Sequence, residues 1–233
     1  PGDLSGDAGL STVLVSGGNG FVAKALIPVL LGRGERVVAT VRSSPARVGE
    51  VCLGDIDAGT DWSAALTDCA VVVHLAARVH VMHDQAAEPL AEFRTVNTAG
   101  TLNLARQAAN AGVRRFVFVS TVKVNGDGFP SLDPRGVTQV YRESDSPAPL
   151  DAYAVSKWEA EQGLHAIAQR TGMAVVILRP PLVYGPGAGG NFLRLMRLVA
   201  RGVPLPFAAV QNRRSLLYVG NLVDAIDLCR THP

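Results

Sequence analysis

The sequence predicts an α/β fold in which a doubly wound parallel β-sheet is covered by helices on both faces. Three observations lead to this prediction. Short Val-rich runs recur along the 233-residue chain, segments with helical spacing lie between them, and a glycine-rich turn follows the first run. Near-continuous apolar runs are typical of strands that are buried on both faces. Their alternation with helices indicates βαβ units.

Five runs are the expected strands of this sheet. Val, Ile and Phe, which favour strands, dominate them. The runs are TVLVSG (12–17), RVVATVR (36–42), AVVVHLAA (70–77), RFVFVST (115–121) and AVVILRP (174–180).

The segments between these strands have the spacing of helices that pack on a sheet. They are residues 20–33, 61–67, 86–111 and 152–171. Asp151 is suited to cap the start of the last helix, and Gly172 follows its end. Pro28 falls inside the first helix, where it removes a backbone hydrogen bond at a cost of about 3 kcal/mol, so we expect a kink or an early break there. The Gly-, Pro- and Asp-rich stretch 125–136 is predicted to be a loop.

Composition excludes several classes of protein. The net charge is +2 and basic residues form no cluster larger than a pair, which argues against a nucleic-acid partner. Cys52, Cys69 and Cys229 lie far apart without CxxC spacing, so neither a disulfide framework nor a metal site is expected, and a reducing compartment is favoured. No apolar run approaches the roughly 18 residues of a membrane span. We therefore expect a cytoplasmic protein with no membrane partner.

The first strand leads directly into a phosphate-binding type of turn, SGGNGFVA (16–23). From its first glycine the pattern is G-x-x-G-x-x-A, and from its second it is G-x-G-x-x-A. Free N–H groups and the dipole at the start of a helix can hold a pyrophosphate there. We expect Gly17, Gly20, Phe21 and Val22 to contact a dinucleotide, NAD or NADP. The alternative is a glycine-rich turn that binds nothing.

The end of the second strand bears on the choice of dinucleotide. An NAD site usually has an acidic residue there, which binds the ribose 2′-hydroxyl. This strand ends in Val41 and Arg42, followed by Ser43 and Ser44. Because a guanidinium suits a 2′-phosphate, Arg42 favours NADP over NAD. A solvated Arg at a strand end is the alternative.

Tyr153 and Lys157 lie four positions apart in the last predicted helix, DAYAVSKWEAE (151–161). Residues at this spacing share one helix face. A Tyr with a pKa near 10 needs a neighbouring cation to exchange protons near neutral pH. The pair is a candidate acid/base, although the spacing by itself can arise by chance.

Together these motifs resemble the extended short-chain dehydrogenases/reductases, in particular the branch of nucleotide-sugar epimerases and reductases. The resemblance runs from residue 12 to 226 and rests on motifs that occur in the expected order. These are SGGNGFVA, GDI (54–56), HLAA (74–77), VNTAGTLNL (96–104), FVFVST (116–121), YAVSK and LRPPLVYGPG (178–187). Family membership implies a Rossmann fold and redox chemistry at C4 of a nucleotide sugar.

The resemblance implies catalytic roles at four positions. Tyr153 would be the acid/base, and Lys157 would lower its pKa and hold the nicotinamide ribose. Thr121 would hydrogen-bond the reacting oxygen, with Ser120 as the second choice at that position or as a substrate contact.

It also implies a set of binding residues. Around the cofactor, Asp55 and Ile56 would lie near the adenine, and Leu75, Ala76 and Ala77 would form the floor, with ordinary core packing as the alternative. Toward the substrate, Asn191 and Arg214 would hold the sugar diphosphate, and a surface Arg without a ligand is the alternative. Asn97 matches a helix residue that supports the site, and a purely structural Asn is equally consistent.

Two departures from the family pattern keep other activities open. Asn125 stands where many 4-epimerases have Tyr, and Arg42 favours NADP. A UDP-sugar 4-epimerase is our first interpretation, and an NADPH-dependent reductase of a UDP-4-keto-6-deoxy sugar is the alternative. A dehydrogenase of a non-sugar alcohol and a non-catalytic dinucleotide sensor are less favoured.

The same resemblance suggests how the chain is divided. Residues 12–180 would form the dinucleotide-binding domain, and residues 181–233 would form a partly missing substrate lobe interleaved with the end of the sheet. The polar start, residues 1–11, instead resembles a disordered leader or an expression scar by its composition. Family members often pair through the helices at 86–111 and 152–171, so a homodimer is possible. Metal ligation is not expected.

Overall fold

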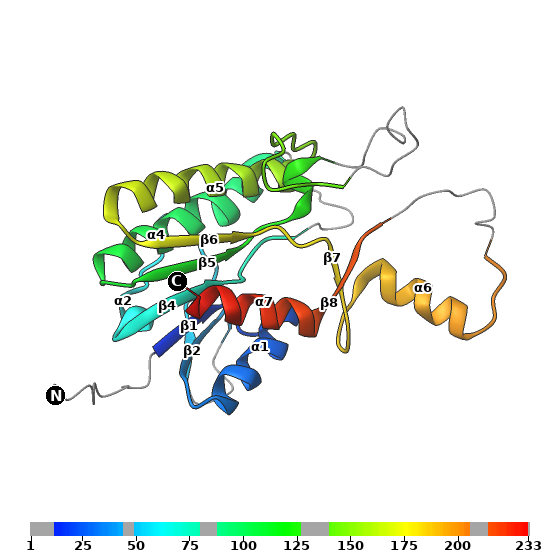
Figure 1. Cartoon of the computed structure of the whole chain (residues 1–233), viewed down its shortest axis with the longest axis horizontal. Coiled ribbons are helices and arrows are strands. Elements are labelled where there is room, and N and C mark those ends of the chain that lie inside the picture. Colours follow the sequence, from blue (N-terminus) through cyan, green and yellow to red (C-terminus); the bar gives the residue numbers. More distant parts are fainter. Residues whose placement is uncertain (1–11, 44–48, 80–87, 127–139, 206–213, 233) are drawn as a thin grey trace, which may run out of the picture.

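The computed structural model describes residues 12–43, 49–79, 88–126, 140–205 and 214–232. Its centre is a six-stranded parallel sheet with the order β3-β2-β1-β4-β5-β6 (Figure 1). The strands are β1 (Thr12–Ser16), β2 (Arg36–Val41), β3 (Glu50–Cys52), β4 (Cys69–His74), β5 (Arg115–Val119) and β6 (Ala174–Leu178). This order is that of a doubly wound Rossmann sheet, which confirms the predicted fold class. β3 is the only strand of this sheet that the sequence did not indicate.

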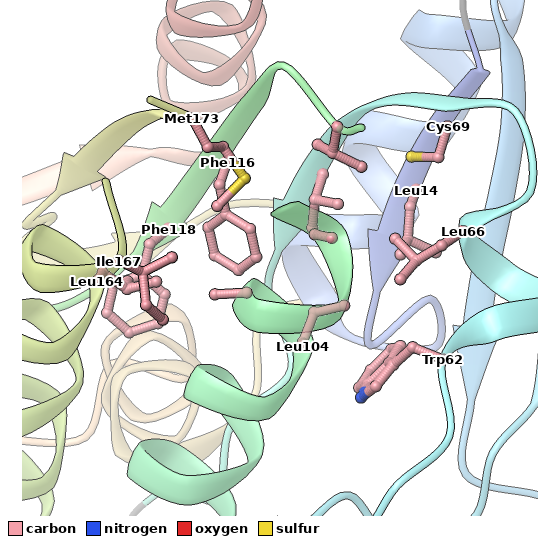
Figure 2. Packing of buried hydrophobic residues seen from close by; sticks show 14 of the residues in the cluster. Leu14, Trp62, Leu66, Cys69, Leu104, Phe116, Phe118, Leu164, Ile167 and Met173 are labelled. Atoms are coloured by element: carbon pink, nitrogen blue, oxygen red, sulfur yellow. The ribbon is translucent and has the colours of Figure 1, made fainter. Parts of the chain in front are cut away.

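Helices cover both faces of the sheet (Figure 1). They are α1 (Phe21–Gly32) and α7 (Val219–Thr231) on one face, and α2 (Ser63–Leu66), α4 (Thr101–Asn110) and α5 (Ala152–Thr171) on the other. Successive residues of β1 take opposite sides: Val13 and Val15 belong to the cluster that includes residues of α1 and α7, whereas Leu14 belongs to the other cluster and lies beside Leu66 of α2 (Figure 2). Burial on both sides explains the continuous apolar runs in the sequence.

The segment expected as one helix over 86–111 has three parts in its described portion. These are α3 (Pro89–Phe93), a π-helical segment, η1 (Arg94–Gly100), and α4. A π-helix adds a residue to the turn and is common beside functional sites. Here it brings Asn97, which is fully buried, toward the first turn of α5, where its amide donates to Ser156 Oγ over 3.0 Å.

The ends of α5 agree with the predicted signals, whereas the interior of α1 does not. Asp151 caps α5 by accepting a hydrogen bond from the Ala154 N–H at 2.7 Å, and Gly172 ends the helix in the left-handed conformation, with φ 74°. The early break expected at Pro28 is wrong, because α1 continues to Gly32. Pro28 and Lys24, whose carbonyl Pro28 cannot bond, are both exposed, so water can satisfy that carbonyl.

Beyond residue 180 the chain leaves the sheet and then returns to it. β7 (Leu182–Tyr184) pairs in parallel with β8 (Leu216–Tyr218), and α6 (Gly190–Ala200) lies between them in sequence. α7 then packs beside α1, with Leu222 and Ile226 in the core (Figure 1). The loop predicted over 125–136 lies outside the described residues except for its start, which is a short 3-10 helix, η2 (Val122–Asn125), and Gly126.

We predict that the core between the sheet and α5 holds this helix in place. Leu164 is fully buried on α5 (Figure 2), so Leu164→Ala should lower the free energy of unfolding by about 2–5 kcal/mol. Leu228 on α7 is 58% exposed, and Leu228→Ala should change the free energy of unfolding by less than about 0.5 kcal/mol. Denaturant titration of both variants tests this. Equal effects would contradict the packing described here.

Candidate active site

The predicted site residues gather at the carboxyl ends of the strands. In the sheet order, β2 and β3 lie on one side of β1, whereas β4, β5 and β6 lie on its other side. The strand order therefore reverses between β1 and β4. Ligands of open α/β sheets bind in the crevice at such a switch point. The glycine turn follows β1, residues 75–77 follow β4 and Thr121 follows β5.

The glycine turn packs directly against the end of β4. Gly17 has φ +73°, and a Cβ built on it would lie 3.0 Å from the Cα and N atoms of Ala76. The turn closes with a hydrogen bond of 2.8 Å from Gly20 N–H to the Gly17 carbonyl. Any side chain at position 17 would therefore be strained and would collide with the neighbouring backbone.

The start of α1 is suited to bind an anion. No side chain in the described part of the chain caps this helix end, and its first turn carries no acidic residue. The first intrahelical bond runs from Lys24 N–H to the Gly20 carbonyl, so the N–H groups of Phe21 and Val22 have no carbonyl partner within the helix. Free donors and the helix dipole at this point fit the pyrophosphate of a dinucleotide.

Arg42 and Asp55, both predicted near the adenosine, form an ion pair. Arg42 Nε lies 2.9 Å from Asp55 Oδ1, and both side chains are more than three-quarters exposed. The sequence led us to expect a guanidinium free to take a 2′-phosphate. A carboxylate already partners it, which reduces the positive charge available to such a phosphate. Ile56 lies next to this pair and is half-buried.

The segment after β4 is held by side-chain hydrogen bonds to its backbone. Ser16 Oγ accepts the N–H groups of Leu75 and Ala76 at 3.0 and 3.1 Å. Asn97 bonds both backbone groups of Arg78: it accepts the N–H at 2.9 Å and donates to the carbonyl at 3.0 Å. Leu75, Ala76 and Ala77 are half-buried, as a cofactor floor requires.

Lys157 is buried, and no carboxylate of the described residues forms an ion pair with it. Its side chain is 2% exposed, and its Nζ donates to the Val119 carbonyl at 2.8 Å. The same nitrogen lies 4.3 Å from the centre of the Phe118 ring, in cation–π geometry. Burial lowers the pKa of Lys157 from 10.5 to about 7, and the more distant charge of Glu161 opposes this shift.

Tyr153 lies one turn before Lys157 on α5. Its ring centre is 6.0 Å from that of Phe93, and the two rings are in an edge-to-face arrangement. Burial raises the pKa of Tyr153 to about 12, and the negative charge of Asp151 adds to the shift. The family resemblance led us to expect a lowered pKa. The Lys157 amine, which the resemblance implies as the lowering charge, donates to the Val119 carbonyl and lies over the Phe118 ring.

Thr121 and Ser120 have different environments. Thr121 Oγ1 accepts the Lys123 N–H at 3.3 Å, which leaves the proton of its own hydroxyl able to donate elsewhere. Ser120 donates to Glu161 at 2.5 Å and is 4% exposed. The Ser120 hydroxyl proton is thus engaged by Glu161, and a substrate contact from Ser120 stays a prediction.

The two residues expected to hold a diphosphate lie in the part of the chain beyond β6. Asn191 is in the first turn of α6, and Arg214 is exposed two residues before β8. Because β7 pairs with β8, the segment that contains Arg214 lies close to the chain just after β6.

Several residues that shape the site were missed by the sequence reasoning. Glu161 is fully buried and binds Arg179 through two nitrogens, with Nη2–Oε2 at 2.5 Å, and Arg179 Nη1 also donates to Asn125 Oδ1 at 3.2 Å. The spacing of Glu161 from Lys157, one turn further along the same helix, was the available signal. His74 was quoted only as part of a motif, and a polar residue at the end of an apolar strand could have singled it out.

The sequence matches the NAD dependent epimerase/dehydratase family over residues 13–233. The chain therefore belongs to this family, as its resemblance to the extended short-chain dehydrogenases/reductases predicted. Membership in this NAD-dependent family confirms the expected nicotinamide dinucleotide cofactor. No helix within the described residues is long and apolar enough to cross a membrane.

Curated relatives narrow the comparison. A UDP-glucose 4-epimerase of Vibrio cholerae is 46% identical over 228 residues, which cover 95% of this chain and 67% of that protein. The N-acetyl-alpha-D-glucosaminyl-diphospho-ditrans,octacis-undecaprenol 4-epimerase of Escherichia coli O157:H7 is 28% identical, over 92% of this chain and 61% of that protein. A 3 beta-hydroxysteroid dehydrogenase/Delta 5-->4-isomerase of Mycobacterium tuberculosis (strain H37Rv) is 32% identical, over 97% and 63%. The chain thus spans 61–67% of the length of these relatives.

Solved structures agree with the fold. MoeE5, in complex with UDP-glucose and NAD, superposes with a TM-score of 0.78 at 32% identity, over 95% of this chain and 72% of that one. The UDP-glucose 4-epimerase of Thermotoga maritima, solved with UDP-glucose, has a TM-score of 0.75 at 24% identity, over 94% and 73%. The second match bears on the fold alone.

We predict that Gly17→Ala weakens the binding of NAD by at least about tenfold, because the new methyl group would press the turn away from Ala76. Gly32→Ala is the matched control, since a Cβ there meets nothing within 4 Å. Isothermal titration of each variant with NAD measures the effect. Equal dissociation constants for the two variants would show that the close approach is not needed for binding.

Burial of Lys157 predicts a specific pH dependence of stability. The folded-state pKa, about 7, lies below the unfolded value of 10.5, so between these pH values the folded state binds fewer protons. The buried Lys157 therefore lowers the free energy of unfolding fully below pH 7. As the pH rises from 7 to 10.5 this penalty decreases, so the free energy of unfolding increases by up to about 1.4 kcal/mol per pH unit.

Lys157→Met should remove this slope, which appears as a difference between the unfolding free energies of wild type and variant at pH 7, 8 and 9. Lys24→Met replaces an exposed lysine of α1 and should keep the wild-type dependence. A Lys157 variant that follows the wild-type pH curve would contradict the assigned burial effect.

Proposed function

We propose that this protein is a UDP-sugar 4-epimerase that holds NAD. The observation that supports the proposal most is the arrangement of three strand ends: an uncapped helix start follows β1, half-buried small residues follow β4, and Thr121 follows β5. Tyr153 and Lys157 lie one turn apart on α5, and Lys157 Nζ donates to the Val119 carbonyl at the end of β5. The 46% identity to a UDP-glucose 4-epimerase supports it. The residues present fit a dinucleotide, because among the described residues no side chain caps the start of α1 and its first turn has no acidic residue.

When bound, the dinucleotide supplies the acceptor and donor of hydride for the sugar carbon and, in its oxidised form, a positive charge. Tyr153, with its pKa raised to about 12, is protonated in the chain by itself and is suited to donate a proton to a sugar oxygen. To accept a proton from the C4 hydroxyl it needs positive charge nearby, and Lys157 is the protein's source of it. Thr121 donates its free hydroxyl proton to the same oxygen.

Asp151 has a secondary effect on the proton chemistry. Its charge raises the pKa of Tyr153, while its second oxygen accepts a hydrogen bond of 2.5 Å from Lys123 Nζ. We propose that this ion pair limits the influence of the carboxylate on the tyrosine, because the ammonium partly neutralises it.

The 4-keto-sugar reductase is less favoured than the epimerase. It depended on Asn125 and on NADP preference from Arg42. Asn125 is buried and its carbonyl oxygen accepts from Arg179, which indicates a structural role. The preference for NADP stays a prediction, and the Arg42–Asp55 pair argues against it.

The remaining proposals concern the whole protein. We propose that residues 181–218 begin a substrate lobe in which Asn191 and Arg214 hold the diphosphate, and that α7 belongs with the sheet. A homodimer through the helices at 86–111 and 152–171 and a cytoplasmic location also remain proposals. The three cysteines are unpaired, which supports a reducing compartment.

The first test is to denature the freshly purified protein and identify the released dinucleotide by mass. Near-stoichiometric NAD, together with interconversion of UDP-glucose and UDP-galactose, is the expected result. An empty protein that binds NADPH tightly, binds NADH poorly and does not interconvert these sugars would transfer the assignment to the reductase.

Tyr153→Phe should reduce kcat by about 100- to 10,000-fold, because the variant can neither give nor take the hydroxyl proton. Its affinity for NAD should stay within about threefold of wild type, since the ring and its contact with Phe93 remain. Initial rates and an NAD titration measure the two effects separately. Retained turnover would remove Tyr153 from the mechanism.

A further inference from the structure

A fully buried histidine links the elements around the dinucleotide site. His74, the last residue of β4, has no exposed surface. Its Nδ1 lies 2.6 Å from Ser16 Oγ at the end of β1, and its Nε2 lies 2.8 Å from Thr101 Oγ1 at the start of α4. Neither Ser16 nor His74 has a role in the proton chemistry proposed above.

The direction of these hydrogen bonds follows from what Ser16 already accepts. Both the Leu75 and the Ala76 N–H groups point at Ser16 Oγ, at 3.0 and 3.1 Å. A hydroxyl has two acceptor positions and one proton, so its proton is what remains for His74. Nδ1 must then be the acceptor, and the Nε2 proton is donated to Thr101.

The surroundings of the ring keep it in this neutral form. Its ring is stacked on Phe118, with centres 5.8 Å apart and planes 17° from parallel, and the Lys157 amine lies over that same Phe118 ring. Burial, with the charge of Lys157 as a smaller cause, lowers the pKa of His74 to about 3. A protonated ring would lose its Nδ1 acceptor, and the environment disfavours it.

We propose that His74 is a positioning residue for the dinucleotide site, which acts by orienting the Ser16 hydroxyl so that both its acceptor positions hold the backbone after β4. That backbone is the surface against which the Gly17 turn packs, so that a Cβ built on Gly17 would lie 3.0 Å from the Cα and N atoms of Ala76. The inference rests on the proposed function only in that a dinucleotide binds at this turn. Loss of the Nδ1 acceptor would free the Ser16 proton to compete for other partners and loosen the floor.

Two amide substitutions separate this role from general core packing. In His74→Asn the side-chain oxygen can take the place of Nδ1, whereas the longer His74→Gln places its amide near the position of Nε2. We expect His74→Asn to bind NAD within about threefold of wild type and His74→Gln to bind at least about tenfold more weakly. His74→Phe, which keeps a ring against Phe118, should be as weak as His74→Gln.

Controls identify the atom responsible. Thr101→Val removes the partner of Nε2 and should bind NAD within about threefold of wild type, whereas Ser16→Ala should match His74→Phe, and combining these two should add nothing more. Titration with NAD alone is the readout, and thermal unfolding of each variant monitors the fold. If His74→Phe does not fold, the comparison of the Asn and Gln variants carries the test.

Three results would overturn the proposal: wild-type affinity in His74→Gln, a loss in His74→Asn as large as in His74→Gln, or an equal loss in Thr101→Val. Wild-type protein that binds NAD but does not interconvert UDP-sugars would contradict the proposed epimerase and leave this test intact. Wild-type protein that binds no dinucleotide would remove the basis of both.

Discussion

The close contact between the glycine turn and the end of β4 is the constraint on which the site depends. Gly17 has no side chain and adopts a positive φ, and a Cβ built on it would lie only 3.0 Å from the Ala76 Cα and N atoms. This contact sets the direction of α1 and therefore of its free N–H groups. On the opposite side of the contact, Ser16 accepts the Leu75 and Ala76 N–H groups and Asn97 accepts the Arg78 N–H, which holds that backbone in place.

Burial of charge is the second feature of the site. Lys157 is enclosed by the Phe118 ring, the Val119 carbonyl and the body of α5, where an ammonium is costly to keep. The more distant Glu161 is engaged with Arg179 and Ser120 and compensates only in part. Burying Lys157 lowers the stability of the fold. It also leaves the Lys157 amine and the Tyr153 phenol in an enclosed site, where each influences the other more strongly than in water.

The π-helical segment explains how α5 is brought to this position. Asn97 donates to Ser156, which in turn donates to the Tyr153 carbonyl at 2.7 Å, while Thr98 donates to the Ser156 carbonyl at 2.8 Å. The same Asn97 binds the segment after β4. One buried amide, in the π-helical segment, thus couples the helix that carries the tyrosine to the backbone after β4.

The sequence by itself determined the parallel sheet, the ends of α5, the glycine turn and the Tyr153–Lys157 pair, because each depends on local pattern: apolar runs, capping residues, glycines at a turn and a spacing of four. It did not reveal the π-helix, the continuity of α1 through Pro28, the hydrogen bond from Ser120 to Glu161 or the hydrogen bonds of His74 with Ser16 and Thr101. These depend on which side chains meet across elements distant in the chain and on how deeply they are buried. Only the tertiary structure decides such contacts, since a pKa or a hydrogen-bond direction is set by neighbours and solvent access rather than by residue type.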